Sequence, residues 1–142
     1  MSEAVISISN ANIYQGSNLI LQDVNFEIEK GEFVYLVGKT GTGKSSLLKT
    51  LYGELPLREG DATVAEFQIK GMTWKQVPFL RRNLGVVFQD FHLLTDRNVY
   101  ENLSFVLRAT GWKEKKQIDE KIEDTLEKVG LKNKSFKMPH EM

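Results

Sequence analysis

The chain has 142 residues, of which 41% are apolar and 27% charged, and this is the composition of a soluble, packed protein of one domain or part of one. Its 19 basic and 19 acidic residues cancel, so no overall positive field favours nucleic acid as a partner. It has no cysteine and only two histidines, His92 and His140, which excludes disulfides, thiolate metal sites and cysteine nucleophiles. An acidic N-terminal segment and the lack of a long apolar run predict a cytoplasmic protein.

The first half of the chain predicts strands followed by a loop and a helix. Alternating apolar residues indicate two paired strands over 5–13 and 20–28. A continuous apolar run at 33–37 indicates a strand buried on both faces. A glycine-rich loop follows, and then leucines at helical spacing predict a helix over 44–52, with Gly53 as its left-handed stop.

The second half changes from strands to helices. Residues 60–69 alternate weakly as strands, Pro78 opens a short helix, and 84–88 is a second candidate for a buried strand. Two longer helices are predicted over 99–109 and 113–129. In the last helix one stripe is apolar, and its charged remainder is interpreted as a solvated face. The stripe consists of Ile118, Ile122, Leu126 and Val129.

Residues 38–45 match the phosphate-binding pattern G-x-x-x-x-G-K-[ST] in full. Glycines let backbone N–H groups approach a phosphate chain, and the start of a helix adds positive potential. The lysine of such a loop reaches the β- and γ-phosphates, and the hydroxyl after it can ligate Mg²⁺. The alternative, a flexible glycine turn that only caps a helix, is disfavoured by the order strand, loop, helix. The predicted nucleotide contacts are Gly38, Lys39, Thr40, Gly41, Thr42, Gly43, Lys44, Ser45 and Ser46.

Other nucleotide-binding classes fit less well. Ser46 occupies the position where a dinucleotide fingerprint requires glycine or a small substitute. A guanine-reading N-K-x-D fails because Phe136 follows Asn133-Lys134-Ser135, and no D-x-x-G occurs. A small-molecule kinase would need an acceptor site and a lid, for which the sequence has no signal. The pattern therefore predicts a triphosphate site of another P-loop class.

Gln89 follows the apolar run 84–88. An amide at the end of a buried strand can reach a metal ion and an attacking water. Asp90 could be mistaken for the aspartate of a strand-end magnesium motif, but Gln89 interrupts the run before it. We therefore predict Gln89, with Ser45, as a metal ligand and Asp90 as a loop residue that faces solvent.

On these residues the whole chain resembles the ATP-binding subunits of ABC systems. The resemblance implies Walker A roles for Lys44 and Ser45, and a Q-loop role for Gln89 in holding Mg²⁺ and linking the site to a membrane partner. It also implies that Tyr14, which lies 24 residues before Gly38, stacks on adenine. By itself, a tyrosine near a strand end is more often a packing residue.

The implied fold is an incomplete α/β P-loop NTPase of the ABC ATPase type. Residues 1–90 would form the antiparallel β subdomain and the nucleotide-binding core, and 91–142 the start of the α-helical subdomain. Residues 138–142 resemble the segment before the family's signature motif, so we expect an N-terminal fragment. It lacks the family's catalytic carboxylate, which predicts ATP binding without turnover. We expect uncovered apolar surface at 33–37, and His140 as an exposed loop residue.

Residues 78–91 and 93–99 further resemble the cell-division branch of the family, with the pair Asp96-Arg97 as the distinguishing detail. By itself that pair is an ordinary exposed ion pair. The resemblance implies a homodimer in full length, an integral membrane partner, and a location at the inner face of the cell membrane. The alternatives are a subunit for lipoprotein or macrolide export, and a non-hydrolysing scaffold that docks through 99–129.

Overall fold

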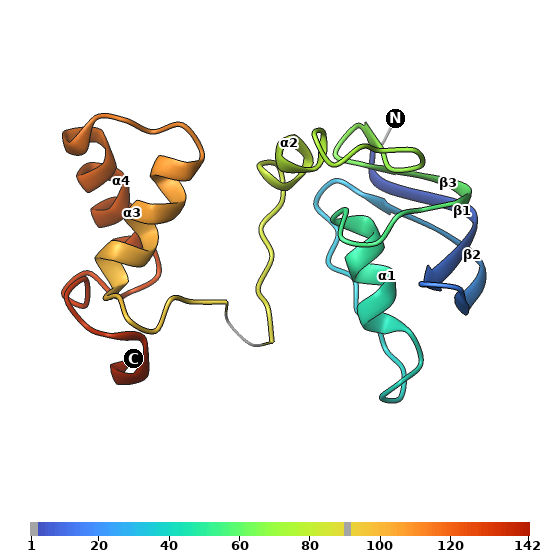
Figure 1. The fold of residues 1–142 in the computed structure, drawn as a ribbon, viewed down its shortest axis with the longest axis horizontal. Coiled ribbons are helices and arrows are strands. Elements are labelled where there is room, and N and C mark those ends of the chain that lie inside the picture. The colour runs from blue at the N-terminus through green and yellow to red at the C-terminus, as the bar shows by residue number, and fades with distance from the viewer. Residues whose placement is uncertain (1–2, 90–91) are drawn as a thin grey trace. The chain divides into compact units, whose positions relative to one another are not determined.

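The computed structural model describes residues 3–89 and 92–142. It forms two compact units, Met1–Val86 and Val87–Met142 (Figure 1). The first unit contains a sheet and two helices, and the second is helical. No helix among the described residues is long and apolar enough to cross a membrane.

The sheet of the first unit has four strands. They are β1 (Ala4–Gln15), β2 (Asn18–Glu29), β3 (Glu59–Val64) and β4 (Phe67–Gln68), in the spatial order β2-β1-β3-β4. Each pairs antiparallel with its neighbour. The predicted pair of strands is confirmed, since β1 and β2 form a hairpin in which Gln15 pairs with Asn18.

Strand β1 contains a bulge near its centre. The pairing of β1 with both neighbours shifts register around Asn10, which adopts a φ of 51°. Gly60 of β3 lies against this bulge with a φ of 89°, and a Cβ there would stand 2.3 Å from the Asn10 carbonyl oxygen. Only glycine therefore fits at position 60.

Two helices cover the apolar side of the sheet. Helix α1 (Lys44–Leu51) and helix α2 (Val77–Arg81) contribute buried leucines to one core with the strands. Gly53, with a φ of 85°, follows the C-cap of α1 and confirms the predicted stop. The buried core consists of Ile8, Ala11, Ile13, Leu47, Leu51, Leu57, Ala62, Val64, Ile69 and Leu80.

The strands predicted at 33–37 and 84–88 are wrong for this structure. Neither segment pairs with any described strand, and both are irregular. A strand buried on both faces needs neighbours on both edges, and β1, β2 and β3 pair only with one another and β4. Val37 is therefore 83% exposed and Val87 94% exposed. The apolar surface expected at 33–37 is indeed uncovered.

The second unit pairs two helices, α3 (Val99–Ala109) and α4 (Lys115–Lys128), close to the predicted ranges. Asn98 and Glu101 form a reciprocal capping box at the start of α3. On α4, Ile118, Ile122 and Leu126 are buried against α3 residues as predicted, whereas Val129 is the C-cap and is exposed. A short 3₁₀ helix, η1 (Pro139–Glu141), ends the unit, and His140 is exposed.

Polar side chains fasten the loops of this unit to α3. Buried Asn102 accepts a hydrogen bond from the Leu94 N–H and donates to the carbonyls of Leu94, Arg97 and Asn98. The Val99 N–H donates to the Lys137 carbonyl at 2.8 Å. These bonds hold the segment before α3 and the segment after α4 against the helix pair.

Candidate nucleotide-binding site

The glycine-rich loop folds as a tight turn that leads directly into α1. Gly41 and Gly43 adopt left-handed φ values of 84° and 97°, which a side chain rarely tolerates. Gly43 is also the N-cap of α1, and Lys44 is the first helical residue. The sequence pattern therefore produces the geometry expected of a phosphate-binding loop before a helix.

Two glycines of the loop have no room for a side chain. A Cβ on Gly38 would stand 2.7 Å from Thr42 Oγ1, and a Cβ on Gly43 would stand 2.7 Å from Ile20 Cγ2 of β2. Gly38 therefore lies close to Thr42 within the loop, and Gly43 lies close to β2 of the hairpin. Glycine is thus required for the compact form of the loop.

Polar contacts fix the interior of the loop. The Lys44 ammonium donates across it to the Gly38 carbonyl, which directs the positive charge inward. Thr42 donates twice to the Lys39 carbonyl, from its N–H at 3.2 Å and from its hydroxyl at 2.6 Å. The turn that displays the loop's N–H groups is therefore stabilised by its own side chains.

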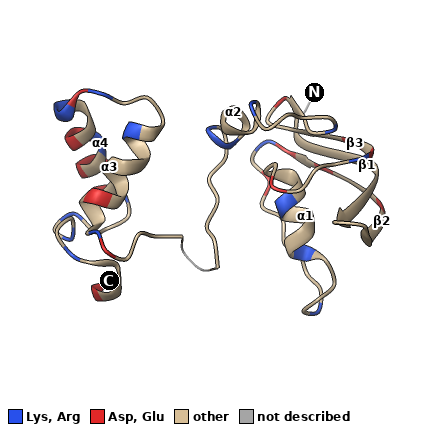
Figure 2. Ribbon diagram, viewed as in Figure 1, with Lys and Arg blue, Asp and Glu red and all other residues tan. Residues whose placement is uncertain are grey.

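The groups gathered at the start of α1 suit a phosphate chain with a divalent ion. The first N–H groups of a helix have no intrahelical acceptor, and the first turn of α1 contains no acidic residue. Ser45 is exposed, so its hydroxyl is accessible to a metal ion, whereas Ser46 is only 9% exposed. Figure 2 shows basic positions on the loop and along α1. Donors with a positive charge and an accessible hydroxyl are the set that a magnesium nucleotide requires.

Tyr14 lies near this loop through the hairpin. It pairs with Leu19, and its neighbour Ile13 pairs with Leu21, beside the β2 residue that Gly43 contacts. The Tyr14 hydroxyl donates to the carboxylate of Glu59 on β3, 3.2 Å from each oxygen. Partial burial of the ring and the Glu59 carboxylate raise the pKa of the Tyr14 hydroxyl above its ordinary value. The stacking of the Tyr14 ring on a base stays a prediction.

Gln89 belongs to the second unit, where it is exposed and lies in a turn. The structure thus brings the loop and the Tyr14 hairpin together within the first unit, and it leaves the contact of Gln89 with Mg²⁺ a prediction. Asp90 lies outside the described residues.

The sequence did not indicate the contacts of Glu59. This residue binds Tyr14 and also accepts a hydrogen bond from the Asn12 side chain. Both partners lie more than 40 residues before it, and no local pattern reports a pairing at that distance. The amphipathic alternation of β1 was the only available signal, because it places Asn12 and Tyr14 on one face.

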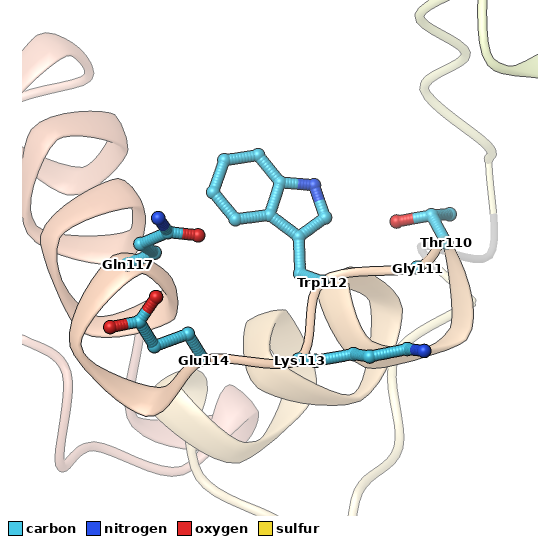
Figure 3. Close-up of a pocket in the computed structure, with 6 residues that line it drawn as sticks. All are labelled: Thr110, Gly111, Trp112, Lys113, Glu114 and Gln117. Carbon is cyan, nitrogen blue, oxygen red and sulfur yellow. The ribbon is translucent and has the colours of Figure 1, made fainter.

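The helical unit contains a hollow at the connection between α3 and α4. Its volume is about 480 Å³, and Figure 3 shows the Trp112 indole standing above the connection from α3 to α4. The residues that line it are Thr110, Gly111, Trp112, Lys113, Glu114 and Gln117. One lysine beside one glutamate does not form an anion site, so this hollow is not a second nucleotide site.

A glycine-rich loop with left-handed glycines, a lysine directed across it and a helix that begins at that lysine define a P-loop nucleotide-binding protein. The ABC transporter family model matches residues 21–142, and the chain belongs to that family. Its sheet and helices are those of an incomplete ABC ATPase nucleotide-binding fold.

Curated relatives include ATP-binding proteins of cell division and of methionine import. The chain is 37% identical over 129 residues to the cell division ATP-binding protein FtsE of Streptococcus pneumoniae D39, covering 91% of this chain and 56% of that protein. FtsE of Escherichia coli K12 is 38% identical, and the match covers 89% of this chain and 56% of that protein. The methionine import ATP-binding protein MetN of Clostridioides difficile is 36% identical, with coverage of 97% and 43%. The chain spans about half the length of these relatives.

Solved structures share the fold. CbiO1 of Clostridium perfringens, part of the ABC transporter complex cbiONQ, superposes with a TM-score of 0.83 at 25% sequence identity. The match covers 99% of this chain and 56% of the CbiO1 chain. The ATP-binding cassette MJ0796, a dimer bound to ADP and phosphate, superposes with a TM-score of 0.80 at 24% identity, with coverage of 96% and 62%. This second likeness concerns the fold alone.

The position of Tyr14 makes a testable prediction about base recognition. Stacking needs a flat ring rather than a hydroxyl, so Tyr14→Phe should bind ATP nearly as well as the unaltered chain, whereas Tyr14→Ala should lose about 1 kcal/mol of binding free energy. Titration with a fluorescent ATP analogue measures both. GTP should bind comparably, and a strong preference for ATP would contradict stacking as the whole basis of recognition.

Proposed function

We propose that this chain binds ATP with Mg²⁺ as part of an ABC-type ATPase subunit that, in full length, hydrolyses ATP to drive a membrane partner. The observation that carries the proposal is the loop at 38–43, with Lys44 directed across it to the Gly38 carbonyl and α1 beginning at the same residue. Membership of the ABC transporter family supports the choice of nucleotide.

Each residue of the site has a distinct task in this proposal. The Lys44 ammonium moves from the Gly38 carbonyl to the terminal phosphates, and the N–H groups at the start of α1 hold the phosphate oxygens. Ser45, together with Gln89, would hold Mg²⁺, and Tyr14 would orient the base. The bound metal would neutralise charge on the phosphates. These residues bind and orient the nucleotide, but they supply no carboxylate to activate water.

The finer proposal is a cell-division subunit similar to FtsE with an FtsX-like integral membrane partner. The FtsE relatives and the Asp96-Arg97 pair support it. Full-length copies would act as a homodimer at the inner face of the cell membrane, without nucleic acid. Residues 1–90 would be the β subdomain and nucleotide core, and residues 91–142 would be the start of the helical subdomain. The boundary of the two compact units, between Val86 and Val87, supports this division.

A transport subunit is the second candidate function, and the MetN relatives support that class. A lipoprotein or macrolide export subunit would belong to it. The non-enzymatic alternative is a nucleotide-dependent scaffold that docks through residues 99–129 and does not hydrolyse ATP. Hydrolysis separates the scaffold from the two ATPase candidates.

Phosphate release tests the enzymatic part of the proposal. We expect the 142-residue chain to release no phosphate from ATP above the level of its Lys44→Ala variant, because Ser45 and Gln89 supply only part of a catalytic site. A natural form that spans the full length of the relatives should release phosphate, and Lys44→Ala should abolish that release.

Two results would contradict this account. Absence of turnover in the longer form would favour the scaffold. Turnover by the 142-residue chain itself, abolished by Asp90→Ala, would show that Asp90 is a catalytic carboxylate and that the chain is a complete small enzyme.

A further inference from the structure

One of the basic stretches in this neutral chain lies around α2, between β4 and Gln89. Between residues 67 and 89 there are four basic residues and no acidic one. They are Lys70, Lys75, Arg81 and Arg82. Figure 2 shows basic positions at α2 and in the turn before it. The stretch is also aromatic, and two of its large rings face solvent.

The first exposed ring stands at the tip of an ordered turn. The Thr73 N–H donates to the Gln76 side-chain oxygen, and the Gln76 N–H donates to the Thr73 carbonyl, both at 2.9 Å. Trp74 and Lys75 lie between these two residues, and Trp74 is 79% exposed. The indole is therefore presented by a hydrogen-bonded turn and not by a loose segment.

The second exposed ring lies on the outer side of α2. Leu80 is fully buried in the core and Val77 is half-buried, so these residues anchor the inner side of the helix. Phe79 therefore points outward and is 56% exposed.

A basic group accompanies each ring. Lys75 Nζ lies 5.7 Å from the Trp74 ring centroid, and Arg82 Cζ lies 5.3 Å from the Phe79 centroid. Arg81 instead turns to Tyr52, donating to its carbonyl at 3.1 Å. The Tyr52 hydroxyl in turn donates to the Glu54 carboxylate at 2.7 Å. We call Trp74, Lys75, Phe79 and Arg82 the aromatic–basic surface.

We propose that the aromatic–basic surface binds the surface of an anionic lipid bilayer directly. The Trp74 indole, with its polar N–H, suits the level of the lipid headgroups, and the apolar Phe79 ring suits the boundary with the acyl chains. Lysine and arginine attract anionic headgroups while their stems cover apolar surface. A nucleic acid fits less well, because it would need basic residues spread along a groove or helix face and the chain carries no net charge. The inference goes beyond the proposed function, since it requires neither nucleotide nor protein partner.

Sedimentation with vesicles of phosphatidylcholine, with and without phosphatidylglycerol, tests the proposal on the intact chain. Binding should require phosphatidylglycerol and should fall as salt rises. The double variant Lys75→Gln/Arg82→Gln should bind about 25-fold more weakly, at about five-fold for each charge. Lys121→Gln/Lys132→Gln removes two exposed charges from the helical unit and should bind as the unaltered chain does. Equal losses in both double variants, or binding to duplex DNA without binding to vesicles, would overturn the proposal.

Tryptophan emission gives a second readout, because the chain has two tryptophans. In a Trp112→Phe variant, Trp74 is the only emitter, and its emission should shift to the blue and become shielded from acrylamide when anionic vesicles are added. In a Trp74→Phe variant, Trp112 reports the helical unit and should change little. A shift of Trp112 without a shift of Trp74 would overturn the assignment to this surface.

Discussion

Replacement of Lys44 by alanine should weaken ATP binding by about 10- to 100-fold, because a hydrogen bond to a charged group contributes about 1.5–3 kcal/mol. Lys44 is the loop residue whose ammonium lies across the loop, at the Gly38 carbonyl. Its removal leaves the N–H groups at the start of α1 but takes away the mobile positive charge. Titration of a fluorescent ATP analogue in the presence of Mg²⁺ measures the loss.

The matched control is Lys49→Ala. Lys49 carries the same charge on the same helix but lies in its last turn, away from the loop. Its removal should change affinity by less than about three-fold, since only a distant screened charge is lost. Equal affinities for Lys44→Ala and the unaltered chain, or equal losses in both variants, would contradict the phosphate-binding role of Lys44.

Gly60→Ala should destabilise the first unit by about 3 kcal/mol, the combined cost of overpacking and backbone strain. The added Cβ would stand 2.3 Å from the Asn10 carbonyl oxygen and 2.5 Å from Ala11 Cα, and both are backbone atoms that cannot rotate away. A φ of 89° adds strain of its own. Urea unfolding followed by the nuclear magnetic resonance signals of the β1 and β3 amides reports this unit alone.

Gly71→Ala separates the two causes of that loss. Gly71 has a similar φ of 75°, but nothing lies within 4 Å of the point where the added Cβ would stand. The Gly71→Ala variant should therefore lose only about 1 kcal/mol of unfolding free energy, which is the cost of the backbone conformation for a residue with a side chain. Equal destabilisation by the two variants would show that the bulge yields to the methyl group and that the close contact at Gly60 is not decisive.

Local features of this fold could be predicted from the sequence. The glycine loop, the start of α1 and the αL residue Gly53 depend on residues within a few positions of one another. The capping box of Asn98 and Glu101 is equally local. For the same reason the ranges of α3 and α4 agree with the amphipathic pattern to within two residues.

Features that depend on partners far away in the chain could not be predicted from the sequence. The apolar run at 33–37 predicts burial, but burial requires neighbouring strands that the described sheet does not place beside it. The contact of Tyr14 with Glu59 crosses 45 residues, and the tight fit of Gly60 against Asn10 arises only once β1 and β3 pair. Amphipathic alternation indicates which residues share a face of a strand, but it does not identify their partners on the neighbouring strand.

Nuclear magnetic resonance of the ¹⁵N-labelled chain, titrated with ATP and Mg²⁺, tests the nucleotide site most directly. Amide shifts report where a ligand binds, residue by residue. The largest changes should occur at Gly41, Gly43, Lys44 and Ser45, with smaller changes at the Tyr14 hairpin. No change at these loop amides, or the largest changes at the hollow around Trp112, would contradict the assignment of the loop as an ATP site.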